Sequence, residues 1–134
     1  EAALAHGLPT SVDFVREGEF DDPDLVREAF LRNPLDAIIC ANDRMAAVLM
    51  RSLQRCGRRV PHDVRLVGFD DVRYATLLSV PLTTIHQPCR EIAAVAFHTI
   101  LDRIADPQLP PRTIGLAPRL VVRESCGAYL PRPG

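Results

Sequence analysis

Polar side chains stand directly after two short apolar runs of the sequence, where a small ligand could be held. Asn42 and Asp43 follow the first run, and Asp70 and Asp71 follow the second. A carboxylate such as that of Asp70 accepts hydrogen bonds from sugar hydroxyls or a base edge, and the Asn42 amide both donates and accepts. Each residue type also caps helices, so an N-cap is the alternative for Asp70 and Asn42. Capping or exposure to solvent is the favoured interpretation for Asp43 and Asp71.

Two further residues are candidates for ligand contact. Phe20 stands in a polar loop between acidic residues, and an aromatic face suits the apolar C–H face of a pyranose. Its alternative is an anchor that fixes the loop to the core. Gln87 precedes Pro88 and either hydrogen-bonds a ligand or caps the helix that begins there.

The sequence carries no motif of a catalytic site. His62 and His86 have no Ser and Asp at a recognisable spacing, and there is neither a Gly-x-Ser-x-Gly elbow nor a glycine-rich phosphate loop. The cysteines form no C-x-x-C pair and are interpreted as small buried hydrophobic residues in a reducing compartment. They are Cys40, Cys56, Cys89 and Cys126. We therefore expect neither an enzyme nor a metal or cofactor site; a hydrolase on a similar fold is the weakest alternative.

The elements that must position these residues alternate between strands and helices. Residues 11–15 alternate apolar and polar side chains, whereas 37–41 form a short continuous apolar run, typical of a parallel strand covered on both faces, and 64–69 are interpreted as another buried strand. A helix is expected from Asp22-Pro23, and another between Asn42 and Gly57. This β-α-β-α-β order predicts an α/β fold with a doubly wound parallel sheet. In such sheets ligands bind outside the carboxyl ends of the strands.

The second half of the sequence is less regular. Residues 82–86 are expected to be extended, and a helix is predicted from Pro88 to about Ala105. Residues 113–122 are interpreted as one or two strands broken at Pro118, and a disordered tail is expected from Gly127.

Composition limits the broad class of protein. The 134 residues allow one hydrophobic core, and a net charge of −1 gives the surface no general attraction for nucleic acid. No apolar run reaches the length of a membrane span. The first six residues read as the tail of a helix closed by Gly7, so we expect further residues upstream. A cytoplasmic location is expected.

Four stretches resemble the LacI/GalR family of bacterial transcription regulators, in matching order and spacing. They are Asp36-Ala-Ile-Ile-Cys-Ala-Asn-Asp-Arg-Met-Ala46, Val60-Pro-His-Asp-Val-Arg-Leu-Val-Gly-Phe-Asp-Asp71, Pro81-Leu-Thr-Thr-Ile-His-Gln-Pro88 and Pro118-Arg-Leu-Val-Val-Arg-Glu-Ser125. In that family a helix-turn-helix head precedes a two-lobed sensor like a type I periplasmic binding protein, and the chain crosses between the lobes three times.

The resemblance implies a division of this chain. Residues 1–81 would be the C-terminal lobe, 82–106 a crossover strand and a helix that belongs to the missing N-terminal lobe, 107–126 the return, and 127–134 a tail. The resemblance places the DNA-binding head outside this chain, so operator DNA would be contacted only through it.

The resemblance also assigns roles to single residues. It places Phe20, Asn42, Asp70 and Gln87 at the ligand, and Cys89 at a position that lines the pocket or simply packs. Ala47, Arg51, Leu77 and Leu78 match positions that contact a second subunit in the family, so a homodimer is expected; for the two leucines the alternative is packing of their loop on its own core.

The function implied is a sensor for a small effector, with a sugar or sugar derivative favoured over a purine. Effector binding would close the two lobes about a hinge and alter the spacing of two DNA-binding heads. The alternative from another class is a periplasmic sugar-binding protein of a transporter, which shares the fold. The Val-Pro…Gly-Phe-Asp-Asp stretch favours the regulator.

Overall fold

The computed structural model describes residues 5–7, 11, 14–18, 20–31 and 35–131. Its centre is one sheet with the strand order β1-β2-β3-β4. The strands are β1 (Ala37–Ile39), β2 (Arg65–Asp70), β3 (Thr83–His86) and β4 (Arg119–Val121). The first three strands run parallel, as predicted, and β4 pairs antiparallel with β3, which makes the sheet mixed.

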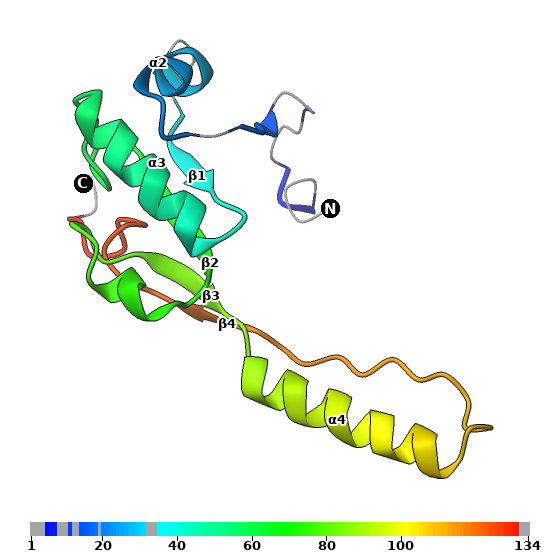
Figure 1. The fold of residues 1–134 in the computed structure, drawn as a ribbon. Coiled ribbons are helices and arrows are strands. Elements are labelled where there is room, and N and C mark those ends of the chain that lie inside the picture. The colour runs from blue at the N-terminus through cyan, green and yellow to red at the C-terminus, as the bar shows by residue number, and fades with distance from the viewer. Residues whose placement is uncertain (1–4, 8–10, 12–13, 19, 32–34, 132–134) are drawn as a thin grey trace.

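The helix α3 (Asp43–Arg55) connects β1 to β2 and covers one face of the sheet (Figure 1). Asn42 begins the helix, because its side-chain oxygen accepts a hydrogen bond from the amide of Met45 at 2.8 Å. Gly57 follows the helix with φ +75°, a conformation that glycine adopts without strain. Helical spacing puts Ala46, Leu49, Met50 and Leu53 on the buried face, where each is at most 2% exposed.

The core lies between α3 and the sheet, and Leu66 of β2 and Leu82 before β3 are completely buried in it. The predicted helix from Asp22-Pro23 is α2 (Pro23–Val26), which continues as the π-helical segment η2 (Arg27–Leu31). The Asp22 carboxylate accepts a hydrogen bond from the amide of Asp24 at 2.9 Å, as expected for an N-cap. Val26 of α2 is fully buried in the same core.

Two strand predictions differ from the structure. The strand predicted over 11–15 is absent from its described residues: the amide of Phe14 donates to the carbonyl oxygen of Ser11 at 3.1 Å, which forms a turn. Residues 12 and 13 lie outside the described part. The strand β1 is not covered on both faces, because Ile39 is 82% exposed whereas its neighbour Ile38 packs against the core. Successive side chains of a strand point to opposite faces, and α3 covers only one of them.

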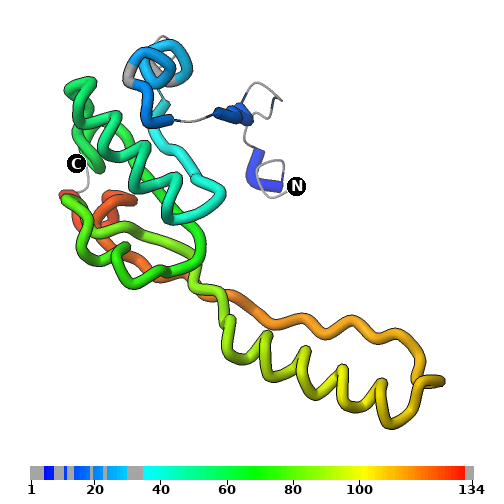
Figure 2. Tube along the Cα trace, in the orientation of Figure 1, coloured from blue at the N-terminus to red at the C-terminus, as the bar shows by residue number. Residues whose placement is uncertain are grey.

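Beyond β2, the 3-10 helix η3 (Arg73–Thr76) leads to the turn before β3. From β3 the chain enters α4 (Cys89–Ala105), which stands away from the sheet together with the returning segment 107–118 (Figures 1 and 2). We call these two segments the arm. The Arg112 guanidinium forms an ion pair with Asp102 of α4 and holds the arm together. None of the residues of α4 is buried.

After β4 the chain packs back onto the sheet. The hydroxyl of Ser125 donates to the carbonyl oxygen of Leu66 at 2.6 Å and accepts a hydrogen bond from the amide of Thr83 at 2.8 Å. The tail is more ordered than predicted, because the amide of Leu130 donates to the carbonyl oxygen of Gly127 and closes a turn. Residues 132–134 lie outside the described part. None of the described helices is long and apolar enough to cross a membrane.

Candidate functional site

Asp70 and Gln87 meet at the carboxyl rim of the sheet. Asp70 is the last residue of β2 and pairs in register with His86, the last residue of β3. Gln87 follows directly and donates from its side-chain nitrogen to one carboxylate oxygen of Asp70 at 2.6 Å. Both side chains are half-buried. The pair offers a second carboxylate oxygen and an amide oxygen, which together accept hydroxyl or amino hydrogens.

Asn42 and Phe20 lie on one open depression, which Gly18, Asp21, Arg44, Met45 and Val48 also line. The side-chain oxygen of Asn42 caps α3, as the alternative interpretation proposed. A hydrogen bond from its side-chain nitrogen to a ligand remains a prediction. Phe20 is 5% exposed and belongs to the core, so its position fits the anchor alternative. Stacking of its ring on a ligand remains a prediction.

The four predicted ligand residues therefore form two pairs. Asp70 and Gln87 do not line the depression that holds Asn42 and Phe20. One residue connects the two pairs: Asp43, next to Asn42 in sequence, accepts a hydrogen bond at 2.9 Å from the amide of Val72, two residues after Asp70. Both pairs thus belong to the rim at which β1 and β2 end.

Sequence reasoning missed the role of Asp43. It is fully buried, and one carboxylate oxygen accepts a hydrogen bond from the Thr84 hydroxyl at 2.6 Å. Gly68 of β2 allows this position, because a Cβ at residue 68 would lie 2.2 Å from the same Asp43 oxygen. Asp43 and Thr84 are 41 residues apart in the sequence, so local spacing could not reveal their contact. The glycine inside a strand was the one local signal in the sequence.

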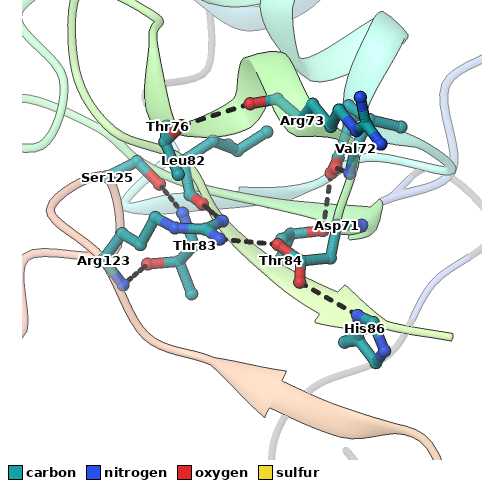
Figure 3. Close-up of polar contacts among 11 residues, drawn as sticks. Asp71, Val72, Arg73, Thr76, Leu82, Thr83, Thr84, His86, Arg123 and Ser125 are labelled. Atoms are coloured by element: carbon teal, nitrogen blue, oxygen red, sulfur yellow. Dashed lines mark hydrogen bonds and ion pairs between the residues drawn. The ribbon is translucent and has the colours of Figure 1, made fainter. Parts of the chain in front are cut away.

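The expectation that Asp71 caps a helix or faces solvent is wrong. Its side chain is 14% exposed, forms an ion pair with Arg123 at 2.6 Å and lies within hydrogen-bond distance of the His86 ring, at 3.0 Å (Figure 3). Burial raises the pKa of the Asp71 carboxyl, but the hydrogen bonds and charges of Arg123 and His86 outweigh it and lower the pKa below its usual value. Asp71 is therefore held as an anion inside the rim.

The four cysteines form no disulfide in this structure, and they differ in burial. Cys40 is buried beside Asp43, and this burial, followed by the negative charge of Asp43, raises the pKa of the Cys40 thiol to about 12. Cys89 is the first residue of α4 and is exposed, so its side chain is not packed in the interior of this structure as the alternative interpretation proposed.

The residues predicted to contact a second subunit come from α3 and from the turn after η3, which are joined by a hydrogen bond. Ala47 and Arg51 occupy one face of α3, and Gln54 on the same face donates to the hydroxyl of Ser79 at 2.8 Å, which joins α3 to the turn after η3. In that turn Leu77 is 82% exposed, whereas Leu78 is half-buried and packs against the core. Leu77 is thus the main apolar contribution to this surface.

Comparison with known proteins places this chain and its fold in a family. The family model described as a periplasmic binding protein-like domain matches residues 1–126. The chain belongs to this family. The four stretches noted in the sequence lie within the matched residues, and the similar proteins described below are LacI-type transcription regulators.

Three similar proteins illustrate the relationship. The HTH-type transcriptional repressor PurR of Vibrio parahaemolyticus is 40% identical over 123 residues, which are 88% of this chain and 36% of the repressor. The transcriptional regulator CelR in complex with cellobiose has a TM-score of 0.82 at 34% identity, over 92% of this chain and 39% of CelR. A LacI-family regulator from Sanguibacter keddieii has a TM-score of 0.79 at 38% identity, over 94% of this chain and 50% of that protein. The chain thus spans about a third of the length of the curated relatives.

Proposed function

We propose that the chain is the effector-sensing part of a bacterial LacI-type regulator and binds a small polyhydroxylated solute at the carboxyl rim of its sheet. The observation that carries this proposal is the Asp70–Gln87 pair, joined at 2.6 Å where the chain leaves the sheet for α4. Hydrogen-bond acceptors held in place at the rim of a parallel sheet suit the hydroxyl groups of a sugar.

The class of effector is supported by similar proteins that are described with a bound sugar. CelR, at 34% identity, is described as a complex with cellobiose, so a sugar is the first candidate ligand for this chain. A purine base is the second, because its edge also presents hydrogens to a carboxylate such as that of Asp70.

The remaining parts of the proposal concern the whole protein. The relatives at 38% and 40% identity are HTH-type repressors about two and a half times as long, which supports control of operator DNA through a head outside these residues. A cytoplasmic homodimer follows from the same role, with Ala47, Arg51, Leu77 and Leu78 at the interface. The transporter alternative is less supported, because CelR and the Sanguibacter keddieii protein are regulators.

A thermal-unfolding screen tests the proposed ligand site. Mono- and disaccharides, starting with cellobiose, and purine bases are added to the chain in solution. A ligand that binds only the folded state, at about ten times its Kd, stabilises that state by about 1.4 kcal/mol and raises the Tm by several degrees. Since half of a two-lobed cleft would lie outside these residues, we expect sugar binding to this chain alone to be weak and to need a high sugar concentration, and we expect Asp70→Ala to abolish it.

The control is Asp36→Ala. Asp36 is an exposed carboxylate that precedes β1 at the opposite, amino end of the sheet, so its loss should leave the ligand effect unchanged. A ligand that stabilises the Asp70→Ala variant as strongly as the parent chain would place the site elsewhere.

A further inference from the structure

The turn that carries Asp70 has an unfavourable backbone conformation. The φ angles of Asp70 and Asp71 are +114° and +58°, in the region that side chains other than glycine rarely adopt. Two successive residues of this kind persist only where the surrounding structure holds them. The contacts that hold the turn therefore decide where the Asp70 carboxylate points.

One set of contacts holds the backbone of the turn. The amide of Val72 donates to Asp43 at 2.9 Å, and the amide of Asp71 donates to the Thr84 hydroxyl at 3.3 Å. The Thr84 hydroxyl in turn donates to Asp43. These bonds tie the turn to the start of α3 and to the middle of β3.

A second set of contacts holds the Asp71 side chain between two segments that lead to the arm (Figure 3). His86 ends β3, through which the chain leaves the sheet, and Arg123 follows β4, through which it returns. Arg123 is itself fixed, because its guanidinium donates to the carbonyl oxygen of Leu82 at 2.8 Å and its amide donates to the Thr83 hydroxyl at 2.8 Å.

We propose that Asp71 is a positioning residue of the effector site: its bonds to Arg123 and His86 fix the turn so that Asp70 faces Gln87. The inference rests on the proposed function, since Asp70 and Gln87 are the proposed ligand groups. It adds that the ligand groups are oriented by the outgoing and returning segments together. A displacement of the arm relative to the sheet acts on Asp71 through both partners and so changes the orientation of Asp70.

Nuclear magnetic resonance of the 134-residue chain, without any ligand, tests this inference. Two signals are followed: the side-chain amide of Gln87, which reports its bond to Asp70, and the hydrogen exchange of the amides of Asp71 and Val72. In Arg123→Gln we expect the Gln87 signal to move to the position of an exposed glutamine. We also expect the two backbone amides to exchange about tenfold faster.

Two further variants separate positioning from general destabilisation. Arg123→Lys keeps the positive charge and should restore the Gln87 signal in part. Arg119→Gln removes an exposed arginine of β4 and should change neither signal. If Arg123→Gln does not fold, Asp71→Asn, which keeps the size of the side chain, takes its place with the same expected result.

An unchanged Gln87 signal in a folded Arg123→Gln or Asp71→Asn variant would overturn the inference. So would an equal change in Arg119→Gln. Because no ligand is present, a failed sugar screen would leave this result standing. An unaltered Gln87 signal would in turn leave the proposed ligand site standing and remove only the positioning role.

Discussion

At the scale of single residues, Asp70 has a backbone conformation that is unfavourable for an aspartate. A φ of +114° suits glycine, yet the position carries an aspartate that a ligand-binding role would explain. Strain of this kind concentrates at functional sites and costs about 1–3 kcal/mol per residue.

The first prediction compares two substitutions of this residue. Asp70→Gly and Asp70→Ala both remove the bond to Gln87, but only glycine relieves the strain. We expect the unfolding free energy of Asp70→Gly to exceed that of Asp70→Ala by about 1 kcal/mol in urea titrations. Equal stability, or a less stable glycine variant, would show that the turn is not strained.

The second prediction concerns Asp71 and pH. Its pKa is lower in the folded chain than in the unfolded chain, so its ion pairs contribute stability above the unfolded value, about 3.9. This contribution is lost as the pH falls through the folded pKa. Asp71→Asn should therefore lose stability relative to the parent at pH 6, and the difference should shrink below about pH 4. Denaturant titrations at several pH values measure it; a difference that does not depend on pH would contradict the ion pairs.

The sequence predicted the position of Asp70 on the rim but not its partners. A strand followed by an acidic residue is a local pattern, and it located Asp70 correctly. The anchors of the turn come from 13 to 52 residues away, from Thr84 against Asp71 to Arg123 against Asp71. Only the fold brings them together, which is why Asp71 was assigned to solvent.

At the scale of elements, the contact between α3 and β2 determines how closely the helix approaches the sheet. Helix and strand were both predicted, because caps and apolar spacing are local signals. The exposed face of β1 was not predicted, since a run such as 37–41 does not reveal which of its faces a helix will cover. The strand expected at 11–15 also depended on partners that local alternation does not specify.

The third prediction tests the contact between α3 and β2. In Gly68→Ala the new Cβ would lie 2.2 Å from an Asp43 oxygen and 2.9 Å from Leu82, so the buried carboxylate must move. We expect a loss of about 3 kcal/mol in unfolding free energy. Gly115→Ala, where nothing lies within 4 Å, is the matched control and should change stability by less than about 1 kcal/mol. Similar losses in both variants would contradict the close approach.

At the scale of the whole molecule, the arm has apolar side chains without cover. Ile92, Phe97, Ile100, Leu101 and Ile104 of α4 are between 42% and 71% exposed. Contiguous exposed apolar surface of this kind marks an interface. The expectation that this helix packs on a further lobe agrees with its exposure, although the assignment to a lobe stays a prediction.

The fourth prediction is that the isolated chain self-associates through α4. Light scattering should show species larger than a monomer, and Phe97→Glu should reduce them. Leu77→Glu, at the predicted dimer surface, is the comparison that tells the two surfaces apart. A monomeric parent chain in which the amides of α4 are protected from hydrogen exchange would contradict the prediction.

The proposed function requires that the Asp70–Gln87 pair and the Asn42–Phe20 pair bind the same solute molecule. A residue-resolved magnetic resonance titration of the chain with cellobiose and other sugars tests it most directly. One sugar should shift the signals of Phe20, Asn42, Asp70 and Gln87 together, along one binding curve, and leave those of Asp36 unchanged. Shifts confined to one pair, or centred on another face of the molecule, would contradict it.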